Sequence, residues 1–322
     1  MPRQLACLFL IAGSLSATVC QGQIFGPPQE VTEVRREGQS TTQRWQVGLM
    51  VTAVNAHCRG TLATVPVPTD WPEQEVREVD REVTGHVTKI DFRTLDNGVR
   101  QMLITIPTVP NGHTAQAVLT FEVTRREILP PEDPSQFRIP RRPPREVSVF
   151  LGESPYIESR HRQIRDLAGT IVRDEQSDWE KVRAIFDWVR ENIEYTNGEL
   201  KGALAALRDG NGDCEELTSL FIALCRAKKI PARTVWIPDH CYPEFYLEDE
   251  QGEGRWFPCE MTGGDYFGSI PATKPVLQKG DDFRVPEKRN ERQRYVAEWL
   301  KVSKVTGPGK PEVRFVRKLL DE

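Results

Sequence analysis

The chain carries the sequence GDCEELTSLFIALCRA at residues 212–227, and this stretch decides how the fold is interpreted. Asp213 and Glu216 have the spacing of a capping box, in which each side chain accepts a hydrogen bond from the backbone of the other residue. Apolar side chains then recur at helical spacing, at Leu217, Leu220, Phe221, Leu224 and Ala227. The pattern predicts a helix that begins at Cys214.

The expected position of Cys214 favours its ionised form. The first turn of a helix presents free backbone N–H groups and the positive end of the helix dipole, and both lower a cysteine pKa from its free value near ~8.5. The same N–H groups could hold an oxyanion. Glu215 and Glu216 oppose the thiolate, so we expect their carboxylates to point to solvent. Because many helical cysteines are buried and inert, Cys214 alone does not identify a site.

A nucleophilic thiolate needs a base, and the base needs a group that orients it. Of the five histidines, only His240 lies downstream of Cys214. It stands in a strand-like segment that a glycine-containing turn at residues 252–254 connects to a second such segment. This hairpin can place Glu260 opposite His240, where a carboxylate would hold the imidazole tautomer.

These residues resemble the motifs of the transglutaminase-like superfamily. The GDC of residues 212–214 is similar to a Gly-x-Cys at a helix start, and the IPAR of residues 230–233 is similar to a Gly-Ile-Pro-Ala-Arg turn into a strand. His240 and the WFPCE of residues 256–260 then resemble a His-Ala-Trp strand and a Trp-x-x-x-Asp strand. The similarity covers residues 155–270. It implies a papain-like α+β fold in which helices pack on an antiparallel sheet.

The resemblance also implies acyl transfer through a thioester. Cys214 would attack a carboxamide or peptide carbonyl, His240 would accept the thiol proton and later protonate the leaving amine, and Glu260 would orient His240. Water or an amine then resolves the thioester, which gives hydrolysis or amine transfer. The resemblance implies a protein or peptide substrate and no metal or organic cofactor. The sequence gives no indication of the oligomeric state.

Two departures from the family pattern leave a second interpretation open. Glu260 stands where the family usually has Asp, and the HCY of residues 240–242 replaces His-Ala-Trp. The alternative is a weakly active or inactive protein with the same fold, acting in binding or as a scaffold at the cell surface. Both departures leave the nucleophile and the base in place.

The cysteines allow a further prediction. If His240 lies directly opposite Glu260, then Cys241 lies opposite Cys259, on the face away from the site, because successive side chains alternate. In an oxidising compartment this register predicts a cross-strand disulfide, or failing that a buried thiol pair. Cys225 follows Cys214 by about three helical turns and is expected in the core.

Residues 41–127 are predicted to form an all-β, sandwich-like domain that precedes the papain-like one. Short apolar segments, some of them alternating, are separated by turns in this region. The DNG of residues 96–98 predicts a hairpin, because Asn-Gly supplies the positive φ angles of a tight turn. No motif for chemistry occurs there.

The remaining boundaries follow from composition. Residues 128–150 are rich in proline and are predicted to be a stiff linker. Residues 151–303 are assigned to the transglutaminase-like domain, in which the SDWE of residues 177–180 is a second capping box. Residues 304–322 are expected to be a C-terminal tail.

Residues 1–22 have the pattern of a cleaved export signal. The apolar run LACLFLIA at residues 5–12 is too short to cross a bilayer, and small residues follow it. Cys20 would allow lipid attachment, but Val19 before it fits a lipobox poorly. We therefore expect a secreted or periplasmic protein with no transmembrane segment in the mature chain.

The overall composition is that of a soluble, folded chain. Of its 322 residues, 38% are hydrophobic and 28% are charged, and the net charge is -4. A weakly acidic chain gives no electrostatic case for a nucleic-acid partner. Beyond the expected signal the chain has five cysteines, namely Cys58, Cys214, Cys225, Cys241 and Cys259. An odd number leaves at least one thiol free of intramolecular pairing.

Overall fold

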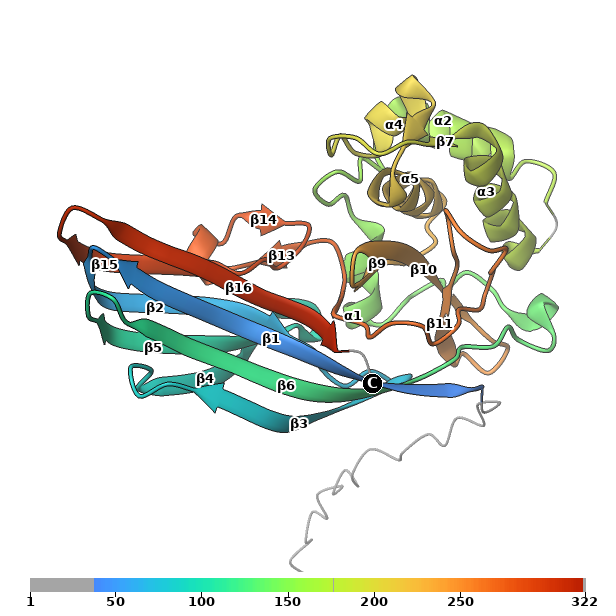
Figure 1. Cartoon of the computed structure of the whole chain (residues 1–322). Helices are drawn as coiled ribbons and strands as arrows, with labels where there is room; N and C mark the ends of the chain where they lie inside the picture. The colour runs from blue at the N-terminus through green and yellow to red at the C-terminus, as the bar shows by residue number, and fades with distance from the viewer. Residues whose placement is uncertain (1–37, 176, 321–322) are drawn as a thin grey trace, which may run out of the picture. The chain divides into compact units, whose positions relative to one another are not determined.

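Strands dominate the first part of the chain in the computed structural model, which describes residues 38–175 and 177–320. The expected export signal lies outside these residues. Two four-stranded sheets have the orders β16-β1-β6-β3 and β15-β2-β5-β4, and all their pairings are antiparallel (Figure 1). Their strands are β1 (Ser40–Val54), β2 (His57–Val67), β3 (Gln74–Val83), β4 (Lys89–Thr94), β5 (Arg100–Val109), β6 (Thr114–Arg126), β15 (Trp299–Thr306) and β16 (Lys310–Leu320).

One hydrophobic core joins the two sheets. Its members alternate along the strands, as Val47, Leu49 and Val51 do in β1, because every second side chain points to the same face. The predicted hairpin at residues 96–98 is confirmed: a short 3-10 turn, η1 (Asp96–Gly98), joins β4 to β5, with a φ of 58° at Asn97. Asparagine tolerates this left-handed conformation better than most residues.

The segment from Trp299 to Leu320 contributes two strands to these sheets, which corrects the prediction of a C-terminal tail over residues 304–322. β16 pairs with β1 from Lys310 to Leu320, and β15 pairs with β2. Phe315 and Leu319 pack against the shared core. Both strands are rich in Lys and Arg, a composition typical of sheet edges, and this masked their strand character in the sequence. The all-β part is therefore built from both ends of the described chain.

The proline-rich segment is also packed rather than a free linker. Ile128 exchanges two backbone hydrogen bonds of 3.0 Å with Ile270. Phe137 is 1% exposed, and its ring centroid lies 4.8 Å from that of Phe257. Apolar residues between the prolines supply surface to bury, which the linker prediction overlooked. The short elements here are η2 (Pro134–Gln136), α1 (Arg145–Ser148) and η3 (Val149–Leu151).

Helices packed on an antiparallel sheet form the second part, in agreement with the α+β expectation. The sheet order is β11-β10-β9-β12, and α5 contacts β10, β9 and the other three long helices (Figure 1). Every residue of α5 from Glu216 to Arg226 is buried. The elements are α2 (Arg162–Ile171), α3 (Asp178–Asn192), α4 (Ala203–Asp209), α5 (Cys214–Ala227), β9 (Ala232–Ile237), β10 (His240–Glu248), β11 (Gly254–Pro258) and β12 (Gln278–Lys279).

The helix starts agree with their sequence signals. Ser177 and Glu180 form the predicted capping box at the start of α3. The remaining short elements are β7 (Glu194–Tyr195), β8 (Asn211–Gly212), β13 (Phe283–Arg284), η4 (Pro286–Lys288) and β14 (Arg292–Gln293). Within residues 38–175 and 177–320, no helix has the length and apolar character needed to cross a membrane.

Candidate active site

Cys214 is the first residue of α5, as the sequence predicts. The Asp213 carboxylate accepts a hydrogen bond from the Glu215 N–H at 2.7 Å, and the Glu216 carboxylate accepts one from the Asp213 N–H at 3.2 Å. The chain enters this cap through Gly212, where a Cβ would lie 2.3 Å from the Glu216 Cβ. Only glycine fits so close an approach, which explains the Gly-x-Cys pattern physically.

The two glutamates beside Cys214 do not point freely to solvent, which corrects the expectation. Glu216 is 2% exposed and also accepts a hydrogen bond of 2.9 Å from the Lys201 N–H. Glu215 is half-buried and forms an ion pair with Arg294. Burial raises the pKa of Glu215 to about 7, although Arg294 acts in the opposite direction. Near neutral pH, Glu215 therefore opposes the thiolate less than a fully ionised carboxylate would.

His240 and Glu260 lie within hydrogen-bonding distance, as the hairpin predicts. His240 Nε2 lies 3.0 Å from Glu260 Oε2 and 3.2 Å from Oε1. The N–H and hydroxyl of Thr262 donate to Glu260 Oε1 at 2.9 and 3.1 Å. The carboxylate is 9% exposed and is held from two sides. Since Glu260 occupies Nε2, Nδ1 is the ring nitrogen left for Cys214.

The three side chains together stabilise a thiolate–imidazolium pair. The pKa of Cys214 is lowered to about 4, first by a hydrogen bond from the Cys241 thiol and then by the hydrogen bond and charge of His240, against the effect of burial. Burial lowers the pKa of His240, but hydrogen bonds and charges from Cys214 and Glu260 raise it to about 9. Between these values the pair carries one charge on each partner.

The order and placement of these residues agree with a known family. Residues 165–261 match the family model described as the transglutaminase-like superfamily. This segment is transglutaminase-like. It runs from α2 through α5 and β10 to the residue after Glu260, so it contains the whole Cys214–His240–Glu260 arrangement.

Solved structures extend the likeness beyond the transglutaminase-like segment. A candidate cysteine protease from Cytophaga hutchinsonii has a TM-score of 0.56 and 18% identity, and the match covers 89% of this chain and 93% of that one. At this identity the likeness concerns the fold alone. A candidate protease from Parabacteroides distasonis ATCC 8503 has a TM-score of 0.29 and 12% identity, over 75% of this chain and 48% of that one, and carries no argument. No curated protein matches the chain.

Arg190 supports the acid of the transglutaminase-like site, and sequence reasoning missed it. This α3 side chain donates hydrogen bonds to the backbone carbonyls of Glu260, Gly263 and Gly264, at 2.6, 3.1 and 3.1 Å. It therefore fixes the loop that carries Glu260. An arginine in the last turn of an amphipathic helix gives no signal that distinguishes it from a surface residue, and α3 alone has two arginines.

The sequence analysis also assigned the wrong neighbour to Cys241. β10 pairs with β11 only from Glu244 onward, and Cys259 donates its N–H to the Pro243 carbonyl at 3.0 Å. Cys259 therefore lies opposite Pro243, two residues from the predicted register. Both cysteines are free thiols, so the expected disulfide between them is wrong. Glu260 still reaches His240 because it stands after the end of β11 and has the longer acidic side chain.

The strand that begins with His240 is also held from the β-sheet side. Arg125 of β6 is 2% exposed and donates a hydrogen bond of 2.7 Å to the Tyr242 hydroxyl. It also donates to the Lys274 carbonyl at 2.6 Å. Tyr242 is 1% exposed, so this bond lies in the interior. The all-β part therefore contributes a buried anchor two residues from the candidate base.

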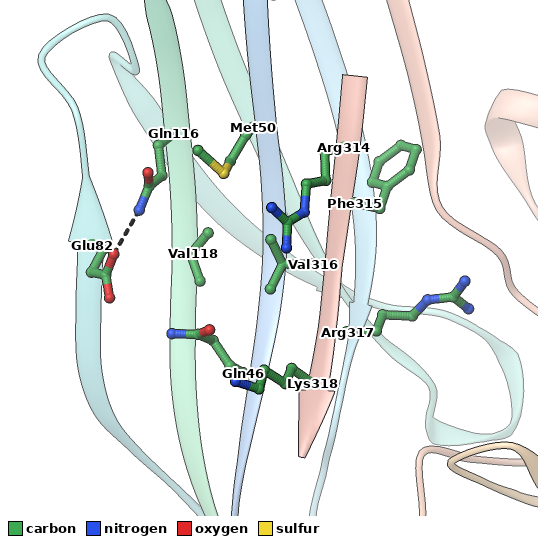
Figure 2. Close-up of a pocket in the computed structure, with 10 residues that line it drawn as sticks. All are labelled: Gln46, Met50, Glu82, Gln116, Val118, Arg314, Phe315, Val316, Arg317 and Lys318. Carbon is green, nitrogen blue, oxygen red and sulfur yellow. Dashed lines mark hydrogen bonds between the residues drawn. The ribbon is translucent and has the colours of Figure 1, made fainter. Parts of the chain in front are cut away.

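Two hollows differ in their relation to this site. One, of about 330 Å³, adjoins Gly212 and is lined by the loop at residues 196–201 together with Asn211 and Glu216. The other, of about 430 Å³, lies on the outward face of β16, β1, β6 and β3, where Gln116 donates a hydrogen bond to Glu82 (Figure 2). Neither hollow has a Cys or His in its lining, but the first lies next to the start of α5, whereas the second lies on the all-β part.

Metal-ligating side chains do not gather elsewhere in the described ranges. Across residues 38–175 and 177–320, no group of three or more His, Cys, Asp or Glu side chains is placed to hold a metal ion. The polar groups around Cys214 are engaged with one another through the capping box and the His240–Glu260 bond.

Proposed function

We propose that this chain is an extracytoplasmic cysteine-dependent enzyme that transfers or hydrolyses acyl groups of carboxamide or peptide bonds through a thioester. The observation that carries the proposal is the arrangement of a cysteine at a helix start, a histidine with a raised pKa and a carboxylate 3.0 Å from that histidine. This is the set of roles that nucleophilic catalysis by cysteine requires. The transglutaminase-like match over residues 165–261 supports the same chemistry.

The proposed sequence of steps begins with the thiolate already formed. Cys214 attacks the carbonyl carbon, and the oxyanion is stabilised by the backbone N–H of Cys214, which has no partner within the helix at that position. Protonated His240 then donates its proton to the leaving amine, and Glu260 keeps the imidazolium oriented. Water or a second amine resolves the thioester, with His240 as the base.

The hollow beside Gly212 is the proposed position for the acyl substrate. Loop residues 196–201 form most of its lining, and Lys201 is the one cation among the lining residues. Backbone groups in a groove favour an extended peptide, which they can bind by main-chain hydrogen bonds. A protein or peptide substrate is therefore favoured over a small apolar one.

To test this, the purified protein is incubated with a mixed peptide library and a biotin-labelled alkylamine, and the products are identified by mass spectrometry. Cleaved or deamidated peptides indicate hydrolysis, and biotinylated peptides indicate amine transfer. Cys214→Ala should abolish these products, while Cys225→Ala, which removes a buried thiol near the other end of α5, should retain them. Products that are equal in the wild type and Cys214→Ala, or absent from both, contradict the proposal.

The alternative, a scaffold with little activity, was motivated by Glu260 and by the residues after His240. The Glu260–His240 distance of 3.0 Å weakens the first motive, because the longer side chain still orients the ring. Cys241 acts to lower the pKa of the Cys214 thiol, which weakens the second motive, because the altered residue then stabilises the thiolate. The enzyme is therefore the better proposal.

Secretion or a periplasmic location is part of the proposal and depends on the sequence of residues 1–22. The pattern of a short apolar run followed by small residues supports export. Expression of the full chain, followed by cell fractionation and determination of the mature N-terminus, tests it. A chain that keeps its first residues and stays with the cytosolic fraction contradicts this part of the proposal.

A further inference from the structure

The first residues of β10 are held by the sheet on one side only. His240 lies opposite Ile237 of β9, but the ladder with β11 does not begin until Glu244. Before His240 the chain turns through Pro238 and Asp239, and Asp239 has a φ of 59°, in the left-handed region. Since this strand end has few ladder contacts, the position of the candidate base depends on contacts from outside the sheet.

Hydrogen bonds from outside the sheet hold the chain on both sides of His240. Lys274 Nζ donates to the Pro238 carbonyl at 2.9 Å, two residues before His240. Arg125 Nη2 donates to the Tyr242 hydroxyl at 2.7 Å, two residues after it. The two ends are connected, because Arg125 Nη1 donates to the Lys274 carbonyl at 2.6 Å. One guanidinium on β6 thus holds both flanks of the candidate base, directly or through Lys274.

The burial of Arg125 gives these contacts a fixed geometry. Arg125 and Tyr242 are 2% and 1% exposed. A guanidinium presents its donors in a rigid planar fork, so it fixes the direction of two acceptors at once. Both acceptors are neutral, and the Glu73 carboxylate, which interacts with the charge of Arg125, is itself paired with Lys279 at 2.7 Å. Burying a cation costs free energy that neutral acceptors offset only in part, so stability alone explains Arg125 poorly.

We propose that Arg125 is a positioning residue for His240, so that the all-β part is required to align the base of the site with its acid. Arg125 acts on His240 through Tyr242 and Lys274 rather than by contact with the reacting atoms. The inference deepens the proposed function and rests on it for the role of His240 as the base. It adds that this alignment is set from the all-β part, which carries no motif for chemistry of its own.

The acid is held from a different part of the molecule. Glu260 accepts hydrogen bonds from the N–H and hydroxyl of Thr262, and Arg190 of α3 donates to the Glu260 carbonyl at 2.6 Å. Base and acid therefore have separate supports, and their 3.0 Å contact depends on both. A displacement of about 1 Å between catalytic groups can cost about 100-fold in rate. Loss of Arg125 should thus release His240 while Glu260 stays in position.

The imidazole of His240 responds to such a displacement through its protonation. Burial lowers the pKa of His240, whereas hydrogen bonds and charges of Cys214 and Glu260 raise it to about 9. The hydrogen bonds weaken steeply when distance and angle change, whereas the effect of burial does not depend on alignment. Release of His240 should therefore lower its pKa, which a loss of stability elsewhere in the protein would not do.

To test this, the histidines of the full chain are labelled with ¹⁵N, and the titration of His240 is followed by NMR, with its signal assigned from His240→Ala. Arg125→Met removes both hydrogen bonds and should lower the His240 pKa by about 1, a tenfold loss of proton affinity. Tyr242→Phe combined with Lys274→Met removes both connections to the His240 segment but keeps Arg125, and should have a similar effect. Arg125→Lys, which keeps the charge but not the fork, should restore part of the pKa.

Two control variants separate alignment from stability. Arg126→Met removes the neighbouring, exposed cation of β6, and Leu49→Ala opens a cavity in the core between the two β-sheets. Both should keep the His240 pKa of the wild type. With any library peptide that is turned over, Arg125→Met should lower kcat by about 100-fold and leave KM nearly unchanged, because the ground-state contacts of the substrate remain.

The NMR titration decides the inference without depending on turnover. An unchanged His240 pKa in Arg125→Met would overturn it, as would an equal fall in Leu49→Ala. Should Arg125→Met not fold, the double variant of Tyr242 and Lys274 decides in its place, because it keeps the buried guanidinium. A protein that shows the shift but turns over no peptide loses the proposed function alone. An active protein whose His240 pKa stays unchanged in these variants loses this inference alone.

Discussion

The two ends of α5 show how differently one helix can treat a cysteine. Cys214, at the start, has a pKa lowered to about 4, although burial acts against this. Cys225, near the end, is fully buried and has a raised pKa, because burial is the largest effect there. The difference comes from hydrogen-bond donors: His240 and Cys241 face the first thiol, and no comparable donor contributes at the second. Burial alone therefore makes a thiol inert, and donors aimed at it make it reactive.

The largest expected effect is the loss of activity on replacing Cys214, which replacement of Cys225 should not cause. Cys214→Ala should reduce turnover of any peptide found in the library by about 10⁴-fold or more, because the nucleophile is lost. Cys225→Ala should keep activity and lower stability by about 1 kcal/mol, because it removes a buried sulfur from the core. Steady-state kinetics and thermal unfolding of both variants measure this. Similar losses of activity in the two variants would break the comparison.

Removing the charge that orients His240 should have the next largest effect. Glu260→Gln should lower kcat by about 10²- to 10³-fold, because the amide holds the imidazolium less well. His240 is protonated below its pKa of about 9, and Glu260 contributes to that elevation. Loss of the charge should therefore move the alkaline limb of the pH–rate profile to lower pH.

Glu260→Asp tests whether the charge or the length of this side chain orients His240, since it keeps the charge and shortens the side chain. Its loss of kcat should be smaller than that of Glu260→Gln, and the alkaline limb should stay closer to that of the wild type. If both variants leave the pH–rate profile unchanged, Glu260 does not act on His240.

The C-terminal end of α5 should respond in stability rather than in chemistry. The Arg226 side chain is 1% exposed and donates to Asp281 at 2.7 and 2.9 Å and to the Ala232 carbonyl at 2.7 Å. Arg226→Met leaves the Asp281 carboxylate buried without its cation, so we expect a loss of about 3–5 kcal/mol in the free energy of unfolding. Chemical denaturation measures it. The double variant Arg226→Met with Asp281→Leu should recover part of the loss, and a fully additive double variant would contradict this account.

The pH dependence of alkylation compares the two thiols directly. Cys214 has a lowered pKa, so its thiolate persists as pH falls and is lost only as pH passes through about 4. In His240→Ala the pKa should rise, so that the iodoacetamide reaction of Cys214 at pH 5 becomes about tenfold slower. Cys225 should stay unlabelled in the native protein because it is buried. A titration of Cys214 near ~8.5 in both proteins would show an unperturbed thiol and remove the basis of the site.

The smallest effect concerns the cap of the helix start. Asp213→Ala removes the acceptor for the Glu215 N–H and should cost about 1 kcal/mol of stability. Asp213→Ser should recover much of this, because serine also caps. Both variants remove a carboxylate near the Cys214 thiolate and should leave its pKa no higher than in the wild type. A raised Cys214 pKa in both would mean that Asp213 acts on the thiol in some other way.

Local signals were sufficient for much of this fold and for the triad. The capping boxes at Asp213 and Ser177 fixed two helix starts, because a cap is defined by residues only three positions apart. The hairpin at residues 96–98 followed from Asn-Gly for the same reason. His240 and Glu260 were found because a turn in the sequence folds two nearby segments together.

The largest error concerns contacts between distant segments. The placement of β15 and β16 against β2 and β1 depends on residues more than 200 positions away, and no local pattern encodes it. The register of β10 on β11 differs by two residues from the prediction, because the turn pairs Glu248 with Gly254 and so places Pro243 opposite Cys259. That shift separates Cys241 from Cys259 by two residues along β10. Arg190 was missed because its hydrogen bonds go to backbone carbonyls, which carry no side-chain signature.

The pairing of the last strands with the first has a consequence for the order of synthesis. β1 and β2 remain unpaired on one side until residues 299–320 have left the ribosome, whereas the helix–sheet region, with its ion-pair partners Asp281 and Arg294, is complete by residue 294. The region that holds Cys214 can therefore finish folding while both β-sheets still expose an open edge to other chains. A nonsense codon just before residue 299 would give a protein in which the Cys214 site can form but in which the unpaired edges of β1 and β2 promote aggregation.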